Sequence, residues 1–127
     1  MHVTSIWQFH ARAWCPSRND FRDFTLGRIK SAVAAPDKAK HTATNDTDWN
    51  RLVDVRFVPH HALTLEQQQV VRDECVAGMM ATRSKVRACL VQYVIQDLRA
   101  ATDPASQLPP EFQLEVANVP ALKPCLF

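Results

Sequence analysis

Five cationic side chains lie within the first 30 residues of the chain, and their chemistry is that of anion binding. They are Arg12, Arg18, Arg22, Arg28 and Lys30. With two acidic residues opposing these five, residues 1–30 carry a formal charge of +3, whereas the remainder, with ten basic and eleven acidic residues, carries −1. Guanidinium groups bind phosphate through paired hydrogen bonds, so an anionic ligand is expected at the amino end.

Aromatic rings among these cations suggest a nucleotide or a nucleic-acid end, because such rings stack on bases. The predicted ligand-binding residues are His10, Arg12, Trp14, Arg22, Arg28 and Lys30. Arg28 is the foremost, since it lies between Leu26 and Ile29, where an arginine without an anionic partner is hard to place. The residues alone favour a plainer interpretation, a solvated hairpin face with a cross-strand pair between Arg12 and Asp23.

Catalytic and metal-binding patterns are not found. Because the chain has only two glycines, it cannot form the glycine-rich loops that bind phosphate. No G-x-S-x-G or H-E-x-x-H motif occurs, so we expect no enzyme activity. His60 and His61 are adjacent, but with His41 they lack metal-ligand spacing, so neither a metal nor a cofactor is expected. The cysteines form no C-x-x-C pair and are expected to be buried thiols; they are Cys15, Cys75, Cys89 and Cys125.

The composition is that of a globular protein. The 127 residues correspond to one domain or two very small ones, with 46% apolar and 22% charged residues. No run of about 18 apolar residues offers a membrane span. The amino end does not resemble a signal peptide, so we expect a cytoplasmic protein that does not bind membranes.

Two alternating runs are expected to place the cations on a β-hairpin. Residues 5–14 and 21–26 each alternate apolar and polar side chains, which is typical of half-buried strands. A register in which paired residue numbers sum to 35 places Ala11 opposite Phe24, Arg12 opposite Asp23 and His10 opposite Thr25. Apolar then meets apolar and charge meets charge, so this register is predicted.

The rest of the chain predicts a second unit of structure. Residues 34–48 are small and polar and read as a linker. A strand is expected over residues 52–58, followed by a helix over 65–77 that Thr64 and Gln67 cap and that Gly78 ends. A second helix is expected over about 83–101, and a strand over 111–116. Three cations, Arg83, Lys85 and Arg87, would lie in the first turn of that helix, where the helix dipole disfavours positive charge. Either a bound anion or exposure to water would reduce this repulsion.

The stretch FHARAWCPSRNDFRDFTLGRI, residues 9–29, resembles the end of a WYL domain, the ligand-sensing module of many bacterial transcription regulators. The family's R-x-F-x-L-x-R-I motif is present in residues 22–29, whereas Phe9, His10 and Ala11 occupy the position of the naming triplet. This stretch looks most like the branch of the WYL family found in phage-defence regulators. Downstream residues also match the carboxyl-terminal dimerisation domain of that branch; they are Trp49, Leu52, Pro59, Leu63, Gln67, Arg87, Tyr93, Leu98, Leu114 and Asn118.

The resemblance implies an α+β protein: a truncated WYL-like unit with a partial SH3/Sm-like β-barrel over residues 1–33, the linker 34–48, and a β-α-α-β dimerisation domain over 49–127. It implies a carboxyl-terminal fragment of a regulator that forms a homodimer and binds a nucleotide or single-stranded nucleic acid at the basic hairpin. DNA would be bound only through a winged helix-turn-helix absent from this chain. The alternative is a stand-alone interaction protein that pairs with a full-length regulator.

Overall fold

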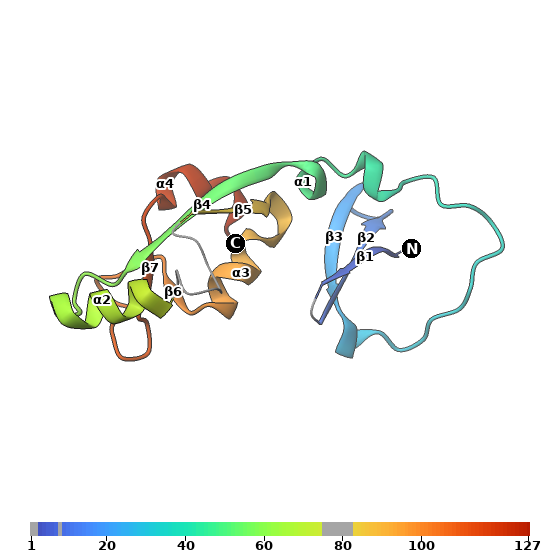
Figure 1. Cartoon of the computed structure of the whole chain (residues 1–127). Helices are drawn as coiled ribbons and strands as arrows, with labels where there is room; N and C mark the ends of the chain where they lie inside the picture. The colour runs from blue at the N-terminus through green and yellow to red at the C-terminus, as the bar shows by residue number, and fades with distance from the viewer. Residues whose placement is uncertain (1–2, 8, 75–82) are drawn as a thin grey trace. The chain divides into compact units, whose positions relative to one another are not determined.

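The computed structural model describes residues 3–7, 9–74 and 83–127 of the chain and has a mixed α+β architecture with two β-sheets (Figure 1). The chain divides into two compact units, Met1–Asn50 and Arg51–Phe127. Each unit contains one of the sheets. The α+β class expected from the sequence is confirmed.

The first unit is built on an antiparallel sheet of three strands in the order β1-β2-β3. The strands are β1 (Val3–Trp7), β2 (His10–Cys15) and β3 (Asp20–Thr25). The predicted hairpin register is confirmed, with His10 opposite Thr25, Ala11 opposite Phe24 and Arg12 opposite Asp23. Burial of apolar side chains on one face specifies such a register, because a one-residue slip would turn them outward.

The single strand expected over residues 5–14 is wrong. Trp7 pairs with His10, so the chain reverses between them and β1 runs back along β2. A tight two-residue turn normally shows Asn-Gly or a similar signal, and residues 7–10 carry none. The reversal adds a third strand to the sheet, with Ile6 opposite Ala11.

The described residues of the first unit do not close into a barrel, so the SH3/Sm-like form is not confirmed, and β1 and β3 are the edges of their sheet. A 3-10 helix, Leu26–Arg28, follows β3. The segment expected as a linker, residues 34–48, ends in a second 3-10 helix, Ala43–Asn45, and in the first residues of α1 (Thr47–Asn50). Asp46, between these two helices, is 2% exposed, so this end of the segment is part of the first unit.

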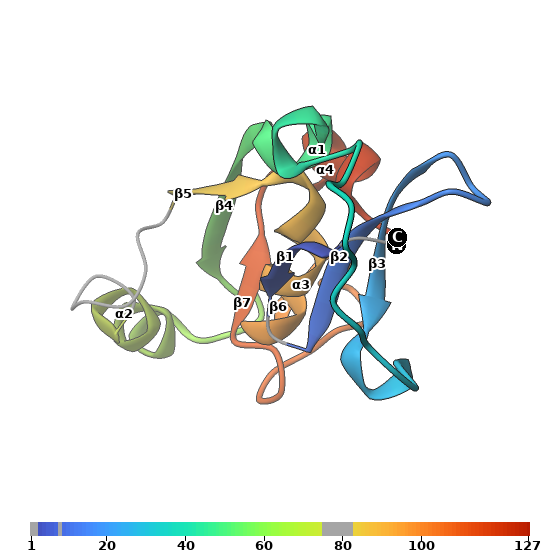
Figure 2. The ribbon, with the colours of Figure 1, turned by 90° about the vertical axis from the view of Figure 1, so that its right-hand side faces the viewer.

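The second unit contains a four-stranded sheet in the order β5-β4-β7-β6, antiparallel except for the β6 and β7 pair. The strands are β4 (Leu52–Pro59), β5 (Arg83–Arg87), β6 (Ala100–Ala101) and β7 (Leu114–Val116). Figure 2 shows β4 alongside β7. The helices are α2 (Leu65–Glu74), α3 (Val91–Asp97) and α4 (Val119–Leu122), with 3-10 helices at Ala88–Leu90 and Lys123–Cys125.

The helix expected over residues 83–101 is wrong. Its first five residues are β5, which pairs with β4 so that Val86 lies opposite Val53, and only Val91–Asp97 are α-helical. Val86 and Leu90, four residues apart, fit a helical stripe as well as one face of a strand, so the partner strand decides. Lys85 lies on a strand, and Arg87, the last residue of that strand, directly precedes the 3-10 helix Ala88–Leu90, so these cations do not occupy the first turn of a long helix. The described elements of this unit consequently do not follow the expected β-α-α-β order.

The core of the second unit lies between the sheet and its helices. It contains Val55, Phe57, Val71, Val91, Ile95, Ala100, Leu114, Val116 and Leu122. The expected cap at the start of α2 is confirmed: the Gln67 N–H donates to Thr64 Oγ1 at 3.2 Å, and the Thr64 N–H donates to Gln67 Oε1 at 3.0 Å. The expected helix end at Gly78 lies outside the described residues. In the described part of the chain, no helix is long and apolar enough to cross a membrane.

Candidate ligand-binding site

The six residues predicted to bind a ligand do not form one cluster, because they lie on both faces of the first sheet. Side chains alternate along a strand, so His10, Arg12 and Trp14 project from one face of β2 and Ala11 and Ala13 from the other. Arg22, opposite Ala13, shares the alanine face. Arg28 and Lys30 lie beyond the end of β3, and both are exposed.

Arg12 is held in a buried ion-pair network rather than in an open site. Its side chain is 9% exposed; Nη1 donates to Asp23 Oδ1 at 3.1 Å and Nη2 to Asp46 Oδ1 at 3.0 Å. Nε also donates to Asp46 Oδ2. The cross-strand pair with Asp23, the plainer of the two interpretations, is present, and Asp46 joins it from 34 residues away. The guanidinium is thereby engaged by two carboxylates of its own unit.

Trp14, predicted to stack on a base, stacks on another residue of the chain. Its ring lies 3.7 Å from that of His41, centroid to centroid, with an angle of 11° between the planes. Phe21 meets Trp14 edge to face at 5.2 Å. Both contacts are favourable arrangements for aromatic rings. The face of the sheet that carries Arg12 and Trp14 is therefore a packing surface.

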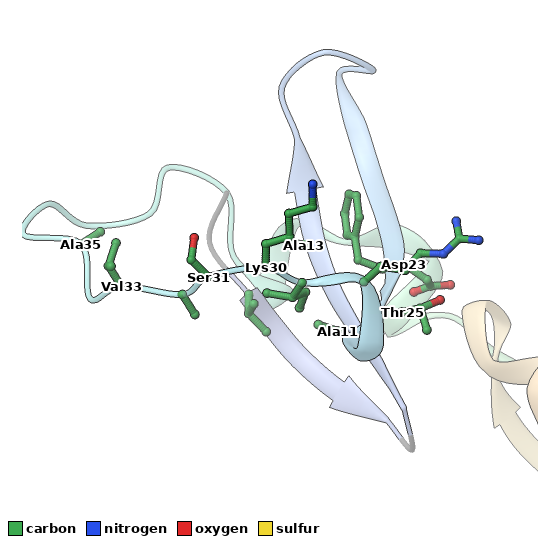
Figure 3. A pocket seen from close by; sticks show the side chains of 13 residues that line it. Ala11, Ala13, Asp23, Thr25, Lys30, Ser31, Val33 and Ala35 are labelled. Carbon is green, nitrogen blue, oxygen red and sulfur yellow. The ribbon is translucent and has the colours of Figure 1, made fainter.

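The alanine face carries a hollow of about 790 Å³. Figure 3 shows Ala11 and Ala13 on β2, and Lys30, Ser31, Val33 and Ala35 along the segment that leaves β3. The full lining is Val3, Ala11, Ala13, Asp23, Phe24, Thr25, Arg28, Ile29, Lys30, Ser31, Ala32, Val33 and Ala35. Ala11 and Ala13 are each only 2% exposed, so they form the buried floor of the hollow.

The hollow combines an apolar wall with two cations and one carboxylate, that of Asp23, which is paired with Arg12. Phe24, Ile29 and Val33 offer apolar surface, and Arg28 and Lys30 offer positive charge. Such a lining suits a molecule with a flat apolar part and an anionic group. The sequence indicated the two cations, but small residues of the segment 31–35 carry no chemical signal, so their part in the hollow was not foreseen.

The Cys15 thiol lies beside the turn from β2 to β3 and is free. Its sulfur is 3.3 Å from the Ser17 hydroxyl. This hydrogen bond, helped by the backbone N–H of Arg18, lowers the pKa of the Cys15 thiol below its ordinary value. Cys15 is buried, as expected of it, whereas Cys89 and Cys125 are partly exposed.

The structure brings Glu115 to the adjacent pair His60 and His61 in the second unit, and their ligand atoms lie within 4.8 Å of one another. Both ring nitrogens of His60 already have partners: Nε2 donates to the Gln107 carbonyl at 2.8 Å, and Nδ1 accepts the Ala62 N–H at 3.0 Å. His61 Nδ1 lies 2.9 Å from Glu115 Oε2. The cluster ties β4 to β7 and to the loop before it, and it leaves His60 no free lone pair for a metal.

Comparison with known proteins identifies relatives of both units. Residues 52–122 match the family model of the "BrxR transcriptional regulator, C-terminal dimerization domain". The DNA-binding transcriptional repressor CapW of Pseudomonas aeruginosa is 31% identical over 123 residues, which are 97% of this chain and 40% of that protein. CapW of Stenotrophomonas maltophilia is 30% identical over 118 residues, 91% of this chain and 39% of that protein.

CapW of Escherichia coli is 29% identical over 113 residues, 88% of this chain and 37% of that protein. The chain thus spans about 40% of the length of the curated relatives it matches. These relatives are named repressors and not enzymes. The matched residues 52–122 lie within the second compact unit and make up more than half of the chain, so the chain belongs to the BrxR family of transcriptional regulators, through their C-terminal dimerization domain.

Proposed function

We propose that the chain is the dimerisation and effector-sensing part of a WYL-type transcriptional regulator. The second unit would hold two copies together, and the first unit would bind an anionic effector in its hollow. Operator DNA would be read by a winged helix-turn-helix in a part of the regulator outside the matched region.

The family match carries the dimerisation role. It covers residues 52–122 and coincides with the unit Arg51–Phe127, which has its own sheet and its own core. A unit with a complete core can present a stable surface to a second copy. The ligand role is a separate step and is supported by the hollow on the first sheet.

A nucleotide or a short single-stranded nucleic acid is the effector that suits this hollow. A base would lie against the Phe24 ring, and a phosphate would lie at Arg28 and Lys30, which line the same space. Arg22, exposed on the same face, would add positive potential. Arg12 and Trp14 would act on the ligand only by stabilising the strand that forms the floor.

The test is titration of a labelled oligonucleotide and of a mononucleotide into the whole chain, with binding followed at several salt concentrations. The affinity should fall as salt rises, because phosphate contacts release counterions. Arg28→Ala should weaken binding by about 1–3 kcal/mol, the range of a lost charge-assisted hydrogen bond.

Arg18→Ala is the matched control, because Arg18 is exposed, carries the same charge and belongs to the same unit but does not line the hollow. It should change binding little. Equal losses for the two variants would indicate diffuse electrostatic attraction instead of a site, and wild-type protein that binds neither probe would refute the effector role.

A further inference from the structure

Helix α2 is held to its own unit by very little. Of its ten residues, Val71 alone is buried, whereas Leu65 is 82% exposed and Val70 is 55% exposed. A helix of this length is marginal in water unless one of its faces is covered. Figure 1 shows α2 beyond the tip of β4, and among the residues that the structure describes α2 contributes only Val71 to the buried core.

The outward face of α2 is acidic with one apolar residue at its centre. Glu66, Val70 and Asp73 follow one another at four and three positions, the spacing that puts side chains on one face of a helix. All three are exposed. Val71, which meets the core, points elsewhere. This face, Glu66–Val70–Asp73, is termed the acidic face of α2.

The outer face of the second sheet has the opposite charge. Along β4, Val55 and Phe57 are buried, and the alternating residues Leu52, Asp54 and Arg56 are exposed. Exposed Lys85 of β5 lies opposite Asp54, and Arg87 lies opposite Leu52. With three described cations, Arg56, Lys85 and Arg87, against two carboxylates, Asp54 and Glu115 of β7, which lies opposite Val58, this face has a formal charge of +1. It is termed the basic face.

We propose that the acidic face of α2 in one copy of the chain docks on the basic face of a second copy. The proposal rests on the proposed dimerisation and names the surface that performs it. In a two-fold dimer the contact is formed twice, since each copy offers both faces. Glu66 and Asp73 meet Lys85 and Arg56, and Val70 lies between these two ion pairs.

The spacing of the charges on the two faces is compatible. Glu66 and Asp73 are seven residues apart, so their backbones lie about 10 Å apart along the helix axis. Arg56 and Lys85 are one strand apart and offset by two residues, a separation of about 8 Å. The flexible stems of arginine and lysine span the difference. Opposite potentials on meeting faces also set the orientation of the partners.

Charge reversal on the whole chain tests the proposal, with the oligomeric state measured by sedimentation. Glu66→Lys with Asp73→Lys makes both faces positive, and Arg56→Glu with Lys85→Glu makes both faces negative. Each double variant should have a dimer dissociation constant at least about tenfold above that of the wild type. Mixing the two variants should restore association, because each α2 then meets a sheet face of the opposite charge.

The matched control is Glu111→Lys with Lys123→Glu, which changes exposed charges of the same unit away from both faces. It should leave the dimer unchanged. Double variants that remain dimeric, or two monomeric variants that do not associate when mixed, would overturn this surface while dimerisation itself stands. A wild-type chain that is monomeric at all concentrations would instead overturn the proposed function. Circular dichroism of each variant shows that it is folded.

Discussion

At the scale of single residues, Arg12 and Asp46 do most to define the first unit. Asp46 is 2% exposed; besides binding Arg12, its Oδ1 accepts the Trp49 N–H at 3.2 Å, so it also caps α1. The pair therefore joins the sheet to the segment that follows it. Removing one partner of a buried ion pair leaves the other charge buried without a partner. The loss in the free energy of unfolding is far larger than the contribution of an exposed pair.

Asp46→Ala should accordingly destabilise the first unit by about 3–5 kcal/mol. Tryptophan fluorescence during urea unfolding is a specific probe, because all three tryptophans, Trp7, Trp14 and Trp49, belong to residues 1–50. Asp37→Ala is the control, since Asp37 is exposed, and it should have little effect. Similar losses in the two variants would show that the Arg12 network is not a main source of stability.

The histidine pair gives a second residue-scale prediction. Because both ring nitrogens of His60 are hydrogen-bonded within the protein, zinc would have to break one of these bonds to bind there. The melting curve should be the same with and without a chelator, and added zinc should not raise the melting temperature. A drop with chelator that zinc reverses would show that His60, His61 and Glu115 bind metal after all.

At the scale of elements, two particular residues follow the ends of α3 and β7, one acting through its backbone and the other through its side chain. Arg99, just after α3, has a φ of 49°, a left-handed conformation that suits glycine. Asn118, after β7, extends the pairing of β4 through its side chain: Oδ1 accepts the Arg56 N–H at 3.0 Å, and Nδ2 donates to the Asp54 carbonyl at 2.8 Å. An amide can do both, and few other side chains can.

Arg99→Gly should stabilise the second unit by about 0.5–1 kcal/mol, because glycine adopts the left-handed conformation without strain. Thermal unfolding followed by circular dichroism measures this. Arg99→Ala keeps the strain and serves as the comparison. A glycine variant less stable than the alanine variant would mean that the backbone conformation is not a source of strain.

Asn118→Ala should destabilise the second unit by about 1–2 kcal/mol, since two backbone groups of β4 lose their partners. Asn118→Asp should recover only part of the loss, because a carboxylate accepts the Arg56 N–H but cannot donate to the Asp54 carbonyl. Urea unfolding followed by circular dichroism distinguishes the variants. An aspartate variant as stable as the wild type would contradict the role of the amide donor.

At the scale of the whole molecule, association and stability are linked. A dimer that forms through the second unit stabilises that unit by mass action, so its melting temperature depends on protein concentration. A tenfold increase in concentration should raise the melting temperature of the second unit by several degrees. The monomeric double variants are the control, and their melting temperature should be the same at every protein concentration. Wild-type melting that does not change with concentration would argue against dimerisation.

Local sequence was sufficient for the elements whose partners are near in the chain. The β2 and β3 register followed from alternation and a short turn, and the cap of α2 followed from Thr64 and Gln67. The basic character of the first unit was evident, and Arg28 and Lys30, predicted to bind the ligand, line the hollow. These features depend on interactions between residues close in sequence, which a local pattern can encode.

Tertiary structure decided the rest, because its partners are distant. The sequence placed Arg83–Arg87 in a helix, since Val86 and Leu90 fit a helical stripe, and only pairing with β4 makes it a strand. Nothing near Arg12 indicates Asp46, and nothing near His61 indicates Glu115. Trp14 and Arg28 were predicted as one site, yet the sheet puts Trp14 on the face away from the hollow. Side-chain direction, ion pairing and cavity shape arise only when distant segments meet.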